Sequence, residues 1–142
     1  MWLEAAFLFE FRLDQVPGVR SFANYEVMHE GGTHLQAFYK GIKQALAAWN
    51  REVAPETDYR KPIASIKALV KGAVHVQLSQ PVFHGPSRTK LGNTEIINEV
   101  AAQVRESLLR MLRMHPQEAE KVLGLVNIHA LMNGSKPASE ID

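Results

Sequence analysis

The sequence contains no cysteine among its 142 residues. This absence excludes thiol catalysis, disulfide cross-links and cysteine-based zinc sites. The longest unbroken apolar run, residues 5–9, is far shorter than the roughly 20 residues that a membrane-spanning helix needs. The first residues carry Glu4 and Glu10, have no basic segment and are followed by no cleavage site for a signal peptide. The sequence therefore predicts a cytoplasmic protein with no membrane partner.

The sequence also lacks an excess of charge of one sign, since it has 16 Lys and Arg and 15 Asp and Glu. This balance argues against a surface built for direct binding of nucleic acid. The six histidines are scattered and form no pair with metal-ligand spacing, so no metal site is predicted. Phosphate-loop, nucleophile-elbow and dinucleotide-binding motifs are absent too. We expect no complete enzyme in this chain.

The chain does have enough apolar residues, 46% of the total, for one self-sufficient core at this length. Alternating apolar residues predict a strand over residues 3–13, a weaker strand over residues 19–25 and a third strand over residues 70–78. Residues 63–69 are ambiguous. Residues 1–134 are interpreted as a single domain, and residues 135–142 as a polar C-terminal tail.

Three helices are predicted from apolar stripes with spacings of three and four residues. The first covers residues 33–52, and Thr33 with Gln36 has the spacing of a capping box at its start. The second follows Asn93, which is a suitable N-cap residue. The third begins at Pro116 and ends at residues 133–134.

Residues 79–92 show no apolar periodicity, and a structureless stretch of this length in a small domain is commonly functional. Its second half places Arg88 and Lys90 beside the hydroxyls of Ser87 and Thr89, just before a predicted helix. Cations and the free N–H groups of a helix N-terminus favour an anion. The loop is therefore a candidate anion site, the alternative being a solvated loop whose cations keep the protein soluble.

The chain also carries a set of short motifs in a fixed order. They are Ser21-Phe22-Ala23-Asn24, His29-Glu30-Gly31-Gly32-Thr33-His34, Phe38, Pro81, Phe83, Gly85, Thr89-Lys90-Leu91-Gly92-Asn93 and Glu95. In this order they resemble the transducer domain (domain two) of the ATPase subunits of type IIA DNA topoisomerases, namely DNA gyrase B and its counterpart in topoisomerase IV. The resemblance runs from about residue 3 to residue 123.

The resemblance implies an α+β fold of the type seen in domain two of ribosomal protein S-five and in the GHMP kinases. Such a fold has a mixed sheet of about four strands with helices packed on it, and a left-handed βαβ crossover. In the family this domain lies between a GHKL-type ATP-binding domain and a Toprim domain. Its long loop inserts a Gln-Thr-Lys motif into the ATP site, where the lysine contacts the γ-phosphate.

The sequence departs from the family at this loop. With the flanking motifs aligned without gaps, Gln-Thr-Lys falls on Pro86-Ser87-Arg88, so the phosphate-contacting lysine is replaced by arginine. Arginine can bind phosphate, but its planar fork is not equivalent to an ammonium group. Arg88, Lys90 and Ser87 are therefore the candidate γ-phosphate residues, with ATP as cofactor only if a separate GHKL-type domain completes the site.

A second departure concerns the helix that lines a DNA-receiving cavity in gyrase-like members. The family's arginines there correspond to Tyr39 and Gln44, while Lys40 and Lys43 fall on other faces. We expect contact with DNA to be indirect at most. Neither flanking catalytic domain is encoded, and Met1 directly before the first strand favours a small complete protein over a piece of a longer subunit.

Two functional hypotheses follow. The leading one is a transducer-like module that couples ATP binding in a neighbouring domain to DNA strand passage and has no ATPase, relaxation or supercoiling activity alone. The alternative is a free-standing regulator or decoy that binds a topoisomerase subunit without nucleotide. Large apolar residues in the first strand and last helix favour an assembly, either with a topoisomerase ATPase subunit or with a second copy of the chain.

Overall fold

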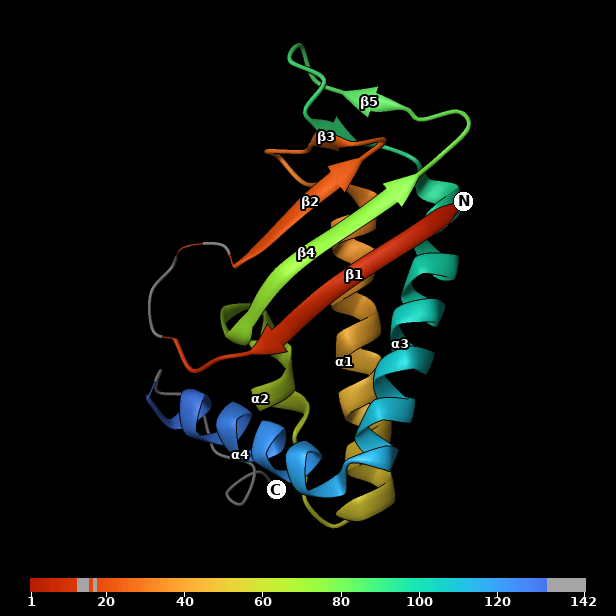
Figure 1. Ribbon diagram of the computed structural model, residues 1–142. Coiled ribbons are helices and arrows are strands. Elements are labelled where there is room, and N and C mark those ends of the chain that lie inside the picture. The colour runs from red at the N-terminus through yellow and green to blue at the C-terminus, as the bar shows by residue number, and fades with distance from the viewer. Residues whose placement is uncertain (13–15, 17, 133–142) are drawn as a thin grey trace.

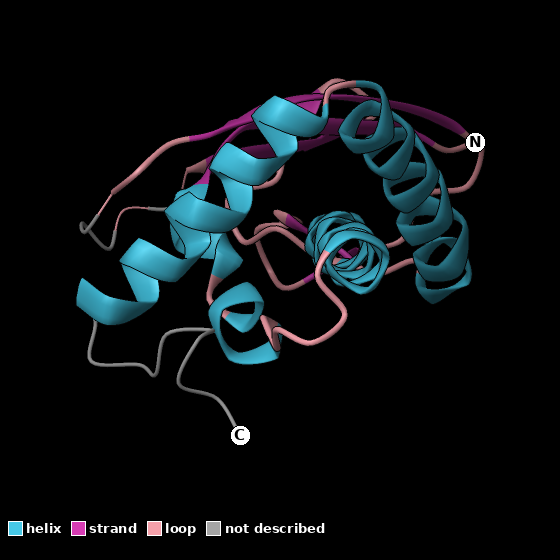
Figure 2. Cartoon of the chain, turned by 90° about the horizontal axis from the view of Figure 1, so that it is seen from below, coloured by secondary structure: helices cyan, strands magenta, loops and turns pink. Residues whose placement is uncertain are grey.

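A four-stranded mixed sheet forms one layer of the fold, and the helices in the described part of the chain cover one of its faces (Figures 1 and 2). The computed structural model describes residues 1–12, 16 and 18–132. The strands are β1 (Trp2–Phe9), β2 (Val19–Ala23), β3 (Glu26–Val27) and β4 (Val70–Gln77). Their order in the sheet is β1-β4-β2-β3, with β4 antiparallel to β1 and parallel to β2. The predicted mixed sheet of four strands is confirmed.

The alternation of apolar residues accounts for how the sheet faces the core. On β4 Val70, Val74 and Val76 are fully buried, whereas Lys71 between them is exposed. On β1 Leu3, Phe7 and Phe9 pack against the core. The predicted first strand was too long, because pairing with β4 ends at Phe9 and Val70. Its last predicted residue, Leu13, lies outside the described residues.

The helices are α1 (Thr33–Val53), α2 (Arg60–Ala64), α3 (Ile97–Met114) and α4 (Pro116–Met132). Short 3-10 turns, η1 (Ile66–Leu69) and η2 (Thr94–Ile96), precede β4 and α3. These elements resolve the ambiguous segment 63–69 as the end of α2 followed by a 3-10 turn. The predicted end of the third helix at residues 133–134 and the polar tail lie outside the described residues.

Helix α1 lies against the inner face of the sheet and alongside α3 (Figure 1). Its apolar stripe is fully buried at Phe38, Ile42 and Leu46, and the Phe38 ring meets Phe7 of β1 edge to face at 5.2 Å. Gly41 lets the two helices approach closely, because a Cβ atom there would lie 2.6 Å from the carbonyl oxygen of Ala101. The core is therefore centred on α1.

The predicted capping box at the start of α1 is wrong. Gly32 is the N-cap residue, with φ 132°, and no side chain caps the helix. The hydroxyl of Thr33 is buried and has no hydrogen-bond partner. A capping box needs Thr33 in the extended N-cap position. Here Thr33 is already the first helical residue, so its hydroxyl is misplaced for that role.

Candidate functional site

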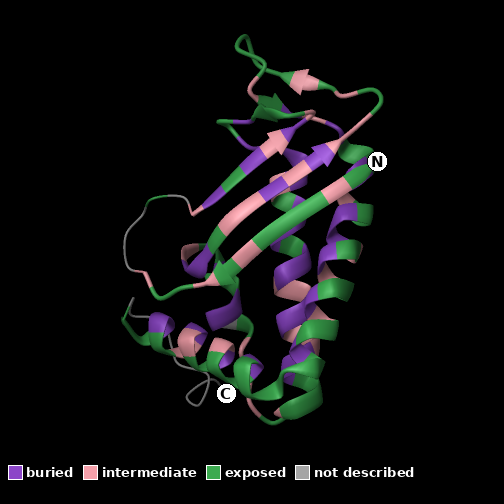
Figure 3. Cartoon of the chain, viewed as in Figure 1, coloured by how far each residue is buried: buried purple, intermediate pink, exposed green. Residues whose placement is uncertain are grey.

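A small β-hairpin carries the candidate anion-binding residues. Its strands β5 (Phe83–His84) and β6 (Lys90–Leu91) pair antiparallel, with Phe83 opposite Leu91 and His84 opposite Lys90. The turn between them is closed by a 3.2 Å bond from the Arg88 N–H to the carbonyl of Gly85, and both residues have positive φ, 56° and 84°. The hairpin projects from one end of the sheet, and its turn is exposed (Figures 1 and 3).

The prediction that residues 79–92 lack regular structure is therefore wrong in part. Each strand of the hairpin has only two residues. An alternating pattern becomes visible over four or more residues, so strands this short leave no periodic signal. Residues 84–88 are exposed, and the hairpin gives this turn a defined shape.

The hairpin is held by the Glu30-Gly31-Gly32 segment that precedes α1. The N–H of Glu30 donates to the carbonyl of Thr89 at 3.1 Å, and the N–H of Leu91 donates to the carbonyl of Gly31 at 3.0 Å. Gly32 forms a parallel β-bridge with Leu91, which is fully buried. Two motifs that lie about sixty residues apart in the sequence are thus one structural unit. The spacing of the motifs alone did not reveal this contact.

Asn93 fixes the other end of the hairpin. Its side chain accepts a 2.7 Å bond from the Val82 N–H, and donates to the carbonyl of Gln80 at 3.0 Å and to Glu95 at 2.6 Å. The bond from Asn93 lowers the pKa of the Glu95 carboxyl. The predicted cap at Asn93 is wrong, because its side chain makes no capping bond and α3 begins only at Ile97.

Asn93→Ala is expected to destabilise the protein by about 2 kcal/mol, because Asn93 is buried and its loss leaves two backbone groups without partners. Urea unfolding measures the change. Asn98→Ala is the matched control, since Asn98 is exposed on α3 and is expected to change stability by less than about 0.5 kcal/mol. Equal effects of the two substitutions would contradict an anchoring role for Asn93.

The structure brings the three predicted phosphate residues, Ser87, Arg88 and Lys90, together on the exposed part of the hairpin. The guanidinium carbon of Arg88 lies over the Phe83 ring, 5.4 Å from its centroid. Such stacking holds the charge in place without neutralising it. In the described part of the chain neither Arg88 nor Lys90 forms an ion pair. Both cations are available to an anion.

Ser87 is less available as a donor. The hydroxyl of Thr89 donates to Glu30 Oε2 at 3.2 Å, and the Ser87 and Thr89 hydroxyl oxygens are 2.9 Å apart. Thr89 has a single hydroxyl proton, so Ser87 must donate its own to Thr89. Glu30 was not predicted to be a neighbour of the loop, although it belongs to one of the motifs that carry the family resemblance.

His34 is fully buried in the first turn of α1, and among the described residues neither of its ring nitrogens has a hydrogen-bond partner. Burial, with a smaller contribution from His75, lowers the pKa of His34 to about 4. The imidazole is therefore neutral at pH 7, and it takes no part in the exposed hairpin site. The sequence around His34 carries no signal for its complete burial.

The two α1 positions predicted to correspond to the family's cavity arginines make contacts within the protein. Tyr39 is buried, its burial raises the pKa of its hydroxyl, and the Lys67 ammonium lies 5.1 Å from its ring centroid. Gln44 accepts a 3.0 Å bond from Arg105 of α3. Neither position offers a cation to DNA.

Within residues 1–12, 16 and 18–132, no group of three or more acidic or histidine side chains could hold a metal ion. No helix in these same ranges is long and apolar enough to cross a membrane.

Comparison with known proteins gives one consistent result. The family model described as DNA gyrase B matches residues 1–135. The DNA gyrase B protein of Streptomyces coelicolor is 33% identical over 123 residues, which cover 84% of this chain and 18% of that protein. That of Borreliella burgdorferi is 31% identical over 108 residues, covering 75% of this chain and 17% of the relative. The chain thus spans less than a fifth of the length of these relatives.

Two solved structures have the same fold. The 43K ATPase domain of Thermus thermophilus gyrase B, in complex with an aminocoumarin, superposes with a TM-score of 0.72 at 27% identity, covering 87% of this chain and 33% of that one. The topoisomerase IV ATP-binding domain of Francisella tularensis, in complex with a small-molecule inhibitor, has a TM-score of 0.74 at 22% identity, covering 92% of this chain and 36% of that one. Because its identity is below 25%, the second shows the fold alone.

Proposed function

Since the chain belongs to the DNA gyrase B family, we propose that it is a transducer-like module of a type IIA DNA topoisomerase. Its role is to couple ATP binding in a neighbouring GHKL-type domain to the passage of a DNA strand. The observation that carries the proposal is the anchored hairpin, which presents Arg88 and Lys90 in solvent without ion-pair partners. The relatives are themselves gyrase subunits, so they do not favour the alternative of a regulator or decoy.

ATP would supply a negatively charged γ-phosphate beyond the tip of the hairpin. Arg88 is suited to bind it, because its guanidinium is already held over Phe83 and offers several N–H donors. Lys90 lies two residues further along, on the pairing strand β6, and would contribute mainly its charge. The partner in this proposal is the ATPase domain of a topoisomerase subunit in the cytoplasm, and DNA is reached only indirectly.

The proposal includes the chain topology, which is that of domain two of ribosomal protein S-five, with a left-handed βαβ crossover. Strands β2 and β4 are parallel and are joined through α1. In Figure 1 α1 lies behind the sheet, and β4 lies to the right of β2 when both strands are viewed pointing upward. A connection with this arrangement is left-handed. The usual handedness of parallel connections is the opposite one, so this feature supports the specific relation to the transducer domain.

The test supplies the chain with a separate GHKL-type ATPase domain from a gyrase subunit. Arg88→Ala is expected to weaken binding of a non-hydrolysable ATP analogue to the mixture by about 10- to 150-fold, the loss of one charge-assisted phosphate contact. Lys90→Ala is expected to have a smaller effect. Isothermal titration calorimetry measures both, and ATP should not bind to the isolated chain.

Arg110→Ala is the matched control, because Arg110 is exposed on α3 away from the hairpin and should leave the affinity unchanged. If Arg88→Ala and Lys90→Ala both leave the affinity of the mixture unchanged, the hairpin has no phosphate-binding role and the proposal is wrong. Thermal unfolding of each variant shows that the fold is retained.

A further inference from the structure

A second surface lies near the end of the molecule opposite the hairpin, where α3 turns into α4. Only His115 separates the two helices, since α3 ends at Met114 and Pro116 begins α4. Proline is tolerated at the first helical position, and it disfavours a helical backbone at the residue before it, so α3 cannot continue through His115, whose φ is −129°. The N–H of His115 still donates to the carbonyl of Met111 at 3.0 Å. This tight elbow leaves a space beside α3 and α4.

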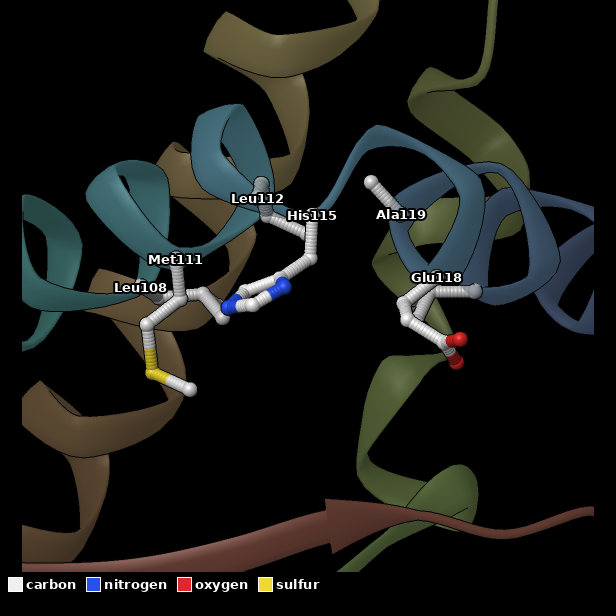
Figure 4. Close-up of a pocket in the computed structure, with 7 residues that line it drawn as sticks. Leu108, Met111, Leu112, His115, Glu118 and Ala119 are labelled. Carbon is white, nitrogen blue, oxygen red and sulfur yellow. The ribbon is translucent and has the colours of Figure 1, made fainter.

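Two hollows occupy that space, with volumes of about 350 and 400 Å³. The first lies in the elbow between α3 and α4, where Met111, His115 and Glu118 line it (Figure 4). The second continues along α3 to Leu3 and Phe7 of β1. Both hollows are lined by Leu108 and Met111, so together they form one groove, called here the elbow groove.

The floor of the elbow groove is apolar and regular. Val104, Leu108 and Leu112 follow one another at intervals of four residues along α3. The stripe is about 12 Å long, which equals roughly two turns of a helix. Met111 stands at the rim with 59% of its surface exposed. Methionine side chains are flexible and adapt to varied apolar partners.

The charged side chains that line the elbow groove are carboxylates. They belong to Glu4 and Glu118, and among the described residues no lysine or arginine lines either hollow. Glu4 is bonded to His75 at 3.2 Å. Glu118 lies 3.8 Å from Lys121 of the same helix, an exposed pair that contributes little stability. In Figure 4 the Glu118 carboxylate points away from the ribbon of α4.

We propose that the elbow groove binds an amphipathic helix of a partner protein that carries lysine or arginine beside its apolar stripe. Apolar side chains spaced by three and four residues would fill the two hollows, as in other helix-in-groove complexes. A basic residue at the end of the stripe would meet Glu118. A second copy of this chain fits less well, because a two-fold interface places the same patch on both sides, and the Glu4 and Glu118 carboxylates of both copies would enter one interface in which Lys121 is already paired with Glu118.

The probe is a labelled 14-residue peptide with leucines at helical spacing and lysines elsewhere, compared with a peptide that has glutamate in place of each lysine. Fluorescence anisotropy with the full chain is expected to show at least about ten-fold tighter binding of the lysine peptide. Met111→Lys should weaken this binding by a similar factor. Met114→Lys is the matched control, because Met114 is exposed on the same helix but does not line the groove.

A second pair of variants tests the charge. Glu118→Gln is expected to weaken binding of the lysine peptide by about three- to ten-fold at low salt, and Glu106→Gln, on the exposed side of α3, should not. The proposal is overturned if the two peptides bind equally, if neither binds, or if Met111→Lys and Met114→Lys act alike. It is also overturned if Met111→Lys only converts a dimer to a monomer in sedimentation, which would make a second copy the occupant.

Discussion

Lowering the pH from 7 to 4 is expected to destabilise the protein by about 3 kcal/mol through His34 alone. Burial lowers the pKa of His34 to about 4 in the folded protein, against 6.5 for an exposed histidine. Between these two values the unfolded chain binds a proton that the folded protein does not bind. The stability is therefore fully present above pH 6.5 and is lost as the pH falls toward 4, with about 2 kcal/mol already lost at pH 5.

Urea unfolding at several pH values measures this loss, and His34→Leu removes the titrating group. The variant should be less sensitive to pH than the wild type between pH 6.5 and pH 4. The pKa values of Glu52 and Glu95 are also lowered, by hydrogen bonds from Arg113 and Asn93 respectively. These carboxyls titrate in both proteins, so the difference between the two curves isolates His34. His34→Gln serves as a second variant without the imidazole. If the free energy of unfolding depends on pH in the same way in the wild type and both variants, the buried imidazole is not the cause of the loss.

Gly32→Ala is expected to destabilise the protein by about 3–5 kcal/mol, the largest effect of any substitution considered at the hairpin. Gly32 has φ 132° and ψ −162°, a backbone conformation that is essentially restricted to glycine. A Cβ atom there would also lie 2.2 Å from the carbonyl oxygen and 2.5 Å from the nitrogen of Leu91. Both atoms are backbone, so no side chain can move aside, and the bridge between α1 and β6 must open.

The same substitution at Gly124 provides the control. Gly124 lies inside α4 and a Cβ atom there meets no atom within 4 Å, so Gly124→Ala should stabilise the protein by about 0.5–1 kcal/mol. Thermal or urea unfolding of both variants gives the comparison. A loss below about 1 kcal/mol for Gly32→Ala would mean that the hairpin is not held against α1 as described.

The parts of the fold that could be predicted from sequence are those with a long periodic signal. Helix α1 and strand β4 were located almost to the residue, because stripes and alternation extend over 21 and 8 residues. The caps could not be predicted in the same way. Thr33 and Asn93 have side chains suited to capping, but neither caps its helix. The Thr33 hydroxyl is buried, and the Asn93 side chain bonds to the backbone of Val82 instead.

The residue types of the candidate site could be predicted from the sequence, but the spatial arrangement of these residues could not. The cations of the loop were recognised from residue type alone, and the resemblance placed them beside a γ-phosphate. The contact of Thr89 and Leu91 with residues 30–32 depends on a chain reversal of about sixty residues. Local patterns carry no information about such a contact. The burial of Tyr39 likewise involves a residue distant in sequence, since the Lys67 ammonium lies 5.1 Å from its ring centroid.

The bridge between Gly32 and Leu91 gives α1 the geometry of a lever arm. The hairpin is fastened directly to the first turn of a helix of 21 residues, about 30 Å long. At its far end Glu52 is bonded to Arg113 through both carboxylate oxygens, near the end of α3. A tilt of about 5° at the hairpin would displace that far end by roughly 3 Å, as much as the width of a water molecule. The hairpin and the Glu52–Arg113 pair are therefore joined by one continuous helix, which also packs along the sheet and α3.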